Sequence, residues 1–183
     1  GGSGIGRATA VRFAEEGAVS GVVDIDAKGA ATTVELIEKY GGTACWFECD
    51  VTDVEAVDSV TKSVIERYGA IDVLVTAAAT SVGKKIPDTL PEEWDQVFAV
   101  NVKGTYLWMR ACIPLMTKGT GSIVALASQL AISGGLSNAA YIASKGAIVS
   151  LCRTAANDHA SEGIRINCIL PGATQTPLLD RSF

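Results

Sequence analysis

A hydroxyl, a phenol and an ammonium group fall close together in one part of this sequence. Tyr141 and Lys145 are four residues apart in SNAAYIASKGAIVSL, whose apolar residues repeat with a period near 3.6. Ser137 or Asn138 could begin this helix as its N-cap. Residues four apart share a helical face, so the ammonium should lie beside the phenol. A free tyrosine has a pKa of about 10, and a nearby cation favours the phenolate, so Tyr141 could exchange protons nearer to neutral pH.

The hydroxyl of the set follows a predicted strand. GSIVALA (121–127) is a short apolar run, and Ser128 comes directly after it, before a glycine-containing loop. The strand end, the loop and the start of the helix can therefore meet at one pocket. A tyrosine and a lysine at this spacing also occur on ordinary helix surfaces, where the lysine stem covers apolar area. The interpretation therefore depends on the rest of the chain.

Apolar runs of strand length alternate with helical segments along the chain. Further strands are predicted at VSGVVD (19–24), TACWFEC (43–49), IDVLVTA (71–77) and early in GIRINCILPGATQTPLL. Helices are predicted at about 27–40, 53–68 and 92–116. Such alternation with nearly continuous apolar strands indicates a parallel sheet covered on both faces, which binds ligands beyond the carboxyl ends of its strands. Four polar residues lie at such ends: Asp24, Asp50, Thr76 and Ser128.

The first residues, GGSGIGRATAVRFAEEG, form a glycine-rich turn that runs directly into an amphipathic helix. The N–H groups and the positive dipole end of a helix N-terminus suit an anion such as pyrophosphate. A plain strand-to-helix turn is the alternative. Asp24 ends the next strand, where its carboxylate can accept hydrogen bonds from a ribose diol and would repel a 2′-phosphate. This favours NAD over NADP, and Asp26 fits better than Asp24 as the N-cap of the following helix.

Composition excludes several other classes of function. The chain has 183 residues with 48% hydrophobic content, which suits one domain with a sizeable core. Its net charge of −5 and its lack of a Lys/Arg cluster argue against a nucleic-acid or anionic-membrane surface. No membrane span or signal peptide is evident, so we expect a cytoplasmic protein. The five cysteines are scattered, and the single His159 lacks partners at zinc-ligand spacing, so no metal is expected.

Ser128 followed by Tyr141-Ile142-Ala143-Ser144-Lys145 resembles the Ser and Tyr-x-x-x-Lys active site of the short-chain dehydrogenase/reductase family. Asn101, in Asn-Val-Lys-Gly-Thr, matches the asparagine of the same tetrad, although an ordinary polar helix position is the alternative. The resemblance implies that Tyr141 exchanges the proton and Ser128 holds the reacting oxygen. It also implies that Lys145 lowers the pKa of Tyr141 and binds the nicotinamide ribose, while Asn101 holds a water that extends the proton path.

The resemblance also implies a dinucleotide site. Gly4 and Gly6 match the last two glycines of the family's Thr-Gly-x-x-x-Gly-x-Gly turn, whose leading Thr-Gly is absent here. Asp50-Val51 would contact adenine, and Thr174 and Thr176 the carboxamide. The reading Thr76-Ala77-Ala78-Ala79 departs from the family's Asn-Asn-Ala-Gly, which lowers the expected cofactor affinity but leaves the chemistry untouched. The full set of expected cofactor contacts is Ser3, Gly4, Ile5, Gly6, Asp24, Asp50, Val51, Thr76, Ala77, Ala78, Tyr141, Lys145, Pro171, Gly172, Thr174 and Thr176.

The implied fold is a single-domain, Rossmann-like, doubly wound parallel α/β sheet over residues 1–183. In such a sheet the strand before the glycine turn is central, and this sequence begins after that strand. Without it, two rows of backbone groups would remain unpaired, at about 1–3 kcal/mol for each orphan. We therefore expect a piece of a longer protein that lacks its first strand and its C-terminal segment.

The implied function is hydride transfer between NAD(H) and a small secondary alcohol or ketone. An NADPH-dependent 3-ketoacyl-(acyl-carrier-protein) reductase is a second hypothesis, against which Asp24 and the absence of a basic residue at Ser3 argue. An inactive dinucleotide-binding regulator is a third, supported by the altered Thr76–Ala79 stretch. The resemblance also implies a homodimer or homotetramer that pairs the helices bearing Asn101 and Tyr141.

Overall fold

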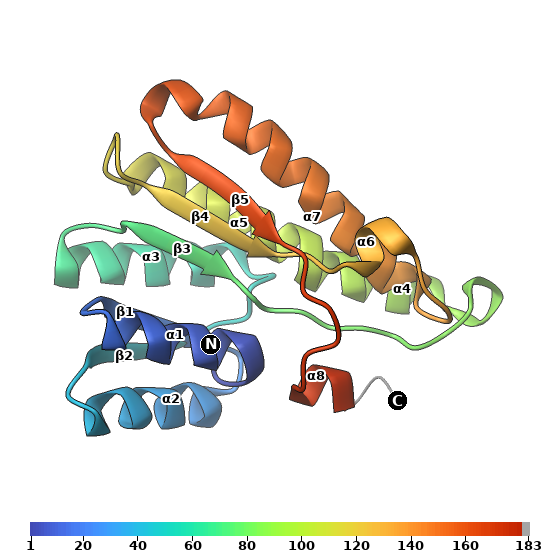
Figure 1. Cartoon of the computed structure of the whole chain (residues 1–183), viewed down its shortest axis with the longest axis horizontal. Helices are drawn as coiled ribbons and strands as arrows, with labels where there is room; N and C mark the ends of the chain where they lie inside the picture. The colour runs from blue at the N-terminus through green and yellow to red at the C-terminus, as the bar shows by residue number, and fades with distance from the viewer. Residues whose placement is uncertain (181–183) are drawn as a thin grey trace.

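The computed structural model describes residues 1–180 as parallel strands layered with helices (Figure 1). The strands are β1 (Val19–Asp24), β2 (Thr43–Glu48), β3 (Val73–Thr76), β4 (Ser122–Leu126) and β5 (Arg165–Ile169). The longer helices are α1 (Gly4–Glu15), α2 (Ala27–Lys39), α3 (Val54–Tyr68), α4 (Pro91–Phe98), α5 (Gly104–Cys112) and α7 (Ala139–Asp158). Shorter helices are α6 (Leu130–Ser133), α8 (Pro177–Asp180) and the 3-10 turns Ile86–Asp88, Ile113–Leu115 and Ala160–Glu162. No helix among the described residues is long and apolar enough to span a membrane.

Every strand pair is parallel, which confirms the predicted α/β architecture. β1 pairs with β2, and a second sheet has the order β3-β4-β5. The arrowheads of β3, β4 and β5 point toward one edge in Figure 1, where α6 and the start of α7 lie. Parallel strands bring their carboxyl ends to the same edge of a sheet, so the residues that follow these strands are collected there.

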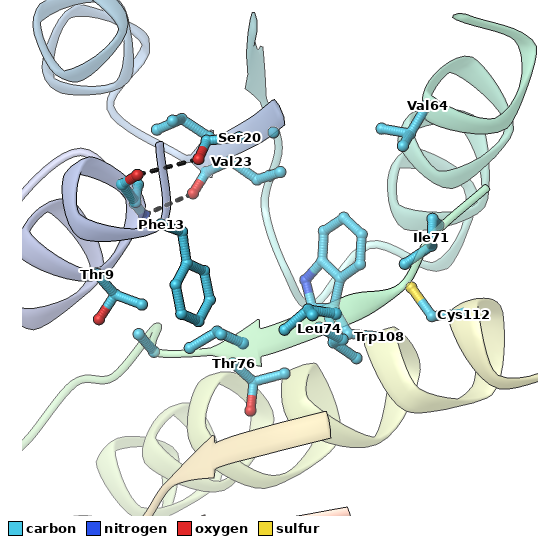
Figure 2. Close-up of a pocket in the computed structure, with 18 of the residues that line it drawn as sticks. Thr9, Phe13, Ser20, Val23, Val64, Ile71, Leu74, Thr76, Trp108 and Cys112 are labelled. Atoms are coloured by element: carbon cyan, nitrogen blue, oxygen red, sulfur yellow. Dashed lines mark hydrogen bonds between the residues drawn. The ribbon is translucent and has the colours of Figure 1, made fainter. Parts of the chain in front are cut away.

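The two sheets flank a cavity of about 650 Å³ between β1 and β3. Figure 2 shows Phe13 and Val23 on one side of this cavity and Leu74 and Trp108 on the other. The Gly1 nitrogen lies at one end of β1 and donates to the Val23 carbonyl at 2.7 Å. In the doubly wound strand order, a further strand lies between the counterparts of β1 and β3.

The core formed by the described residues has three separate clusters of buried apolar side chains. The first joins β4 and β5 to α5 and α7 through residues such as Ile123, Ile148 and Ile166. The second packs α1 and α2 on β1, and the third lies between α3 and α5. The elements that carry Ser128 and Tyr141 therefore share one cluster, so burial of apolar area holds them together.

The helix predicted over residues 92–116 is not continuous. It is divided into α4, a π-helical turn at Ala99–Lys103, and α5. Asn101 is fully buried at the centre of the π turn. Single π turns inside α-helices re-aim side chains and are frequent at functional sites. A hydrophobic period of 3.6 does not reveal such a turn, because the apolar pattern continues through it.

Candidate active site

Ser128 and Tyr141 meet where β4 ends and α7 begins. Ser128 is buried, and its Oγ accepts a hydrogen bond from the Leu130 N–H at 3.2 Å. Burial raises the pKa of the Tyr141 phenol, while a hydrogen bond with Ser128 acts in the opposite direction and lowers it; the net effect is a raised pKa. Tyr141 is therefore protonated at neutral pH in this structure, with a hydroxyl group as its direct neighbour.

Lys145 lies one helical turn after Tyr141, as the spacing predicted. Its Nζ is 5.5 Å from the centroid of the Tyr141 ring and donates to the Leu126 carbonyl at 2.6 Å. Only 2% of the residue is exposed, and this burial lowers the pKa of Lys145 to about 8. The expected net lowering of the Tyr141 pKa is wrong for this structure, because burial of the phenol dominates and raises the pKa.

Asn101 connects two elements that lie far apart in the sequence. Its Oδ1 accepts from the Thr80 N–H at 2.8 Å, and its Nδ2 donates to the Thr80 carbonyl at 3.0 Å. The same Nδ2 donates to Ser144 Oγ at 2.9 Å. Asn101 therefore reaches α7 one residue before Lys145, but through Ser144 rather than through Tyr141 or Lys145 themselves.

The glycine turn begins α1 in the predicted manner. Gly4 has φ +52, a left-handed conformation that side chains rarely adopt, and a Cβ there would lie 3.2 Å from Thr176 Cγ2. Ser3 is the N-cap residue of α1, but its side chain makes no capping hydrogen bond. Ile5 and Gly6 follow within the first turn. The N-terminal N–H groups of α1 thus open beside the segment that contains Thr176.

Asp24 lies against this turn at the end of β1. Its Oδ2 accepts from the Gly2 N–H at 2.8 Å and from the Gly1 nitrogen at 3.0 Å, and its Oδ1 accepts from the Asp26 N–H at 3.0 Å. Burial by itself would raise the pKa of Asp24, but the hydrogen bonds from the Asp26 and Gly2 N–H groups act in the opposite direction, and the pKa is lowered. Asp24 is therefore a carboxylate held beside the glycine turn, while Asp26 is the N-cap residue of α2 without a side-chain capping bond.

The remaining predicted cofactor residues lie along the carboxyl ends of the strands. Asp50 is exposed, and its Oδ1 accepts from both the backbone N–H and the hydroxyl of Thr52 at 2.8 Å. Thr76 is buried, and its hydroxyl has no hydrogen-bond partner among the described residues. Val51 packs closely on Gly104, where a Cβ would lie 2.7 Å from its Cγ2. Ala77 and Ala78 follow β3, and Ala77 lies 3.5 Å from where a Cβ on Gly6 would be.

The segment after β5 returns to the end of β4, beside Ser128. The Pro171 carbonyl accepts from the Gln129 N–H at 3.0 Å, next to Ser128. A Cβ on Gly172 would lie 3.4 Å from the Gln129 side chain. Thr174 is exposed, and the Thr176 hydroxyl accepts from the Leu179 N–H at 3.3 Å. The structure therefore brings this segment between the glycine turn and the end of β4.

Three residues that the sequence analysis did not single out support these groups. The Arg7 guanidinium donates to the Gly2 carbonyl and to Thr33 Oγ1, the latter at 3.0 Å, so it braces the glycine turn against α2. Ser144 supports Asn101 as described above. The position of Arg7 directly after the glycine turn was the only sequence signal for Arg7 and Thr33. No sequence signal marked Ser144.

The shape of the turn fits a dinucleotide. A Cβ on Gly2 would lie 2.8 Å from the Ala30 nitrogen, so only glycine keeps this backbone close to Asp24 and α2. The uncapped Ser3 hydroxyl, the free N–H groups of α1 and the Asp24 carboxylate offer donors for phosphate and an acceptor for a ribose diol. Within residues 1–180, no group of three or more His, Cys, Asp or Glu residues could hold a metal ion.

Comparisons with known proteins agree with this geometry. A family model described as enoyl-(acyl carrier protein) reductase matches residues 1–182. The chain is 36% identical over 181 residues to a 3beta-hydroxysteroid dehydrogenase of Mediterraneibacter gnavus, covering 98% of this chain and 66% of that protein. It is 34% identical to a 3-oxoacyl-[acyl-carrier-protein] reductase of Thermotoga maritima, covering 98% of this chain and 73% of that protein.

A crystal structure of NAD⁺-bound xylitol dehydrogenase matches with a TM-score of 0.90 at 36% identity, covering 93% of this chain and 66% of that one. The chain thus spans about two thirds of the length of the first curated relatives. The matched family model, the parallel sheet and the convergence of Ser128, Tyr141 and Lys145 agree with one another. The chain belongs to the short-chain dehydrogenase/reductase family.

Proposed function

We propose that this protein is an NAD-dependent oxidoreductase that interconverts a secondary alcohol and a ketone. The observation that carries the proposal is the meeting of three groups at the carboxyl end of β4. There the Ser128 hydroxyl lies close enough to the Tyr141 phenol to affect its pKa, and the Lys145 ammonium faces the same phenol ring. These groups lie at the sheet edge at which doubly wound folds bind their ligands.

The proton step follows from the ionisation of Tyr141. Because burial raises the pKa of the phenol, Tyr141 carries a proton that it can donate to the oxygen of a ketone. The Ser128 hydroxyl would hold that oxygen by a hydrogen bond and fix its distance from the phenol. In the oxidation direction, Tyr141 accepts the proton of the alcohol. A bound nicotinamide would supply or accept the hydride at the substrate carbon.

Lys145 and Asn101 would assist this exchange in different ways. The Lys145 charge stabilises the phenolate that remains after proton donation. Thr80 and Ser144 accept both Nδ2 hydrogens of Asn101, so its side chain cannot donate a hydrogen bond to a water. Its backbone carbonyl accepts from Thr105 Oγ1 at 2.8 Å. We assign the water-binding role to that carbonyl.

The cofactor would lie along the edge that the glycine turn and the strand ends form. Ser3, Gly4, Ile5 and Gly6 would bind the pyrophosphate at the start of α1. Asp24 would accept from the adenosine ribose, and its negative charge favours NAD over NADP. The adenine would contact Asp50 and Val51. The nicotinamide end would contact Thr76, Ala77, Ala78, Lys145, Pro171, Gly172, Thr174 and Thr176.

Replacement of the proton donor tests the proposal. We expect Tyr141→Phe to lower kcat by about 10²–10⁴-fold, because general acid–base catalysis contributes that much, while NADH binding changes little. The assay follows the absorbance of the reduced cofactor across a panel of secondary alcohols. Tyr40→Phe is the control, since Tyr40 is an exposed tyrosine at the end of α2. Wild-type turnover in Tyr141→Phe would remove the proposed proton donor.

The two other hypotheses predict different results in the same assay. A 3-ketoacyl-(acyl-carrier-protein) reductase would be faster with NADPH than with NADH. The similarity to the Thermotoga maritima reductase supports this second hypothesis. A dinucleotide-binding regulator would bind NADH in a titration but turn over none of the alcohols. Rates with both cofactors, measured beside the titration, separate the three.

We also propose that the protein forms a dimer or tetramer through α5 and α7. Tyr106 on α5 and Leu115 in the turn after it are exposed apolar side chains, which suits a contact between copies. The alternative is that these side chains simply face solvent. The molar mass in light scattering separates the two.

A further inference from the structure

A continuous series of hydrogen bonds joins the loop after β3 to the helix that carries Tyr141. Asn101 pairs with both backbone groups of Thr80, accepting from its N–H at 2.8 Å and donating to its carbonyl at 3.0 Å. The Asn101 amide thus makes the same two hydrogen bonds to Thr80 that an opposite residue on an antiparallel strand would make. The orientation of the Asn101 amide therefore fixes the position of the Thr80 backbone.

Ser144 fixes the orientation of that amide in turn. Its Oγ accepts from Asn101 Nδ2 at 2.9 Å, and its hydroxyl donates to the Tyr141 carbonyl at 2.7 Å. Both Ser144 and Asn101 are fully buried. A buried amide N–H without an acceptor is costly, so the amide is held in the orientation in which its N–H groups reach Thr80 and Ser144.

The hydrogen bond between Asn101 and Ser144 matters for the candidate active site because of where Ser144 lies. Ser144 lies between Tyr141 and Lys145 on α7, and the π turn that contains Asn101 packs against the same helix. Thr80 belongs to the stretch that follows β3 and contains the predicted cofactor contacts Ala77 and Ala78. One hydroxyl thus connects the proton-exchanging helix with the loop expected to border the nicotinamide.

The alternative is that the Ser144 hydroxyl supports only its own helix. Serines in helices often donate to a carbonyl three or four residues earlier without any wider role. Ser63 on α3 does so, donating to the Ser59 carbonyl at 2.9 Å. The difference is that Ser144 also accepts a hydrogen bond from the side chain of a distant, buried residue. Ser63 is therefore the matched control for a serine whose hydroxyl only supports its own helix.

We propose that Ser144 is a positioning residue, which holds the Asn101 amide so that the loop at Thr80 is fixed against the catalytic helix. The proposal rests on the proposed oxidoreductase function for its effect on rate. Its structural part, the restraint of Thr80, is independent of turnover. Ser144→Ala removes the acceptor for Asn101, whereas Ser144→Cys keeps a weaker acceptor and donor of similar size.

The test measures steady-state kinetics and amide hydrogen exchange on the purified protein. For Ser144→Ala we expect kcat to fall about tenfold or more with little change in the KM for the alcohol, because misplacement of reacting groups affects the rate more than binding. We expect the Thr80 amide to exchange about tenfold faster, while amides of β4 such as Ile123 keep their protection. Ser144→Cys should fall between Ala and the wild type, and Ser63→Ala should match the wild type.

Each other outcome contradicts the proposal. If Ser144→Ala keeps wild-type kcat and wild-type exchange at Thr80, Ser144 positions nothing. If exchange accelerates equally at Thr80 and in β4, the hydroxyl contributes only to global stability. If Ser144→Ala does not fold, the Ser144→Cys protein decides, and unchanged exchange at Thr80 in that variant overturns the proposal. Failure of the proposed function is recognised separately, by wild-type turnover in Tyr141→Phe.

Discussion

The half of the molecule around α7 and the half around the glycine turn are built in different ways. Around α7, side chains make the site: Ser128, Lys145 and Asn101 are buried, and each has a hydrogen-bond partner. Around α1, the backbone makes the site, because Gly2 and Gly4 allow the chain to approach α2 and the segment after β5 closely. The first half should therefore be sensitive to functional groups, and the second to the addition of a single carbon atom.

Among the substitutions that compare these two halves, Lys145→Met should produce the largest effect, mainly on activity. Loss of the ammonium should lower kcat by about 10²-fold or more, because the phenolate loses its nearby positive charge. The free energy of unfolding should fall by no more than about 1 kcal/mol, since methionine removes a buried charge whose desolvation is costly and loses one hydrogen bond. Steady-state kinetics and urea denaturation measure the two effects. A large loss of stability with little loss of rate would make Lys145 a structural residue.

The pH dependence of ketone reduction should reveal the same lysine in the unmodified protein. Burial lowers the pKa of Lys145 to about 8, so the ammonium is present below that pH and is lost above it. The raised pKa keeps Tyr141 protonated over this range. We therefore expect kcat/KM for reduction to be level below about pH 8 and to fall by about tenfold per pH unit above it. A profile that stays level up to pH 10, or a break that persists in Lys145→Met, would contradict the assignment.

Two alanine substitutions compare the halves at the scale of one methyl group. In Gly2→Ala the new Cβ would lie 2.8 Å from backbone atoms of Gly29 and Ala30, so we expect a loss of about 1–3 kcal/mol of stability and weaker NADH binding. In Gly146→Ala, on α7, the Cβ meets no atom within 4 Å, and the helix should gain about 0.5–1 kcal/mol. Thermal unfolding and NADH titration measure both. Equal effects would show that the glycine turn is no tighter than the helix.

Much of the fold was predictable because it depends on local patterns. Within residues 1–180, apolar runs and their spacing located the five strands and most of the longer helices to within a few residues, but they did not reveal that the helix predicted at 92–116 is divided by a π turn. The helix caps were less predictable: Asn138 begins α7, but its side chain makes no capping bond, and its Oδ1 has no partner among the described residues. Capping geometry depends on the path of the preceding loop, which residue type alone does not specify.

The limits of the site prediction have the same origin. Tyr141 and Lys145 were predictable as neighbours because four residues on a helix always share a face. The direction of the Tyr141 pKa was not, because it depends on how deeply the surrounding elements bury the phenol. Ser144 was missed because its partner, Asn101, is 43 residues away in the sequence.

The sequence by itself therefore determined the order of strands and helices, the glycine turn and the candidate residues for proton exchange, since each depends on residue type and short-range spacing. The tertiary structure alone decided which of these groups are desolvated and which share hydrogen bonds. Burial and long-range pairing are properties of the packed chain. Lys145 shows both parts: its place one turn from Tyr141 follows from the sequence, and its lowered pKa follows from the core around it.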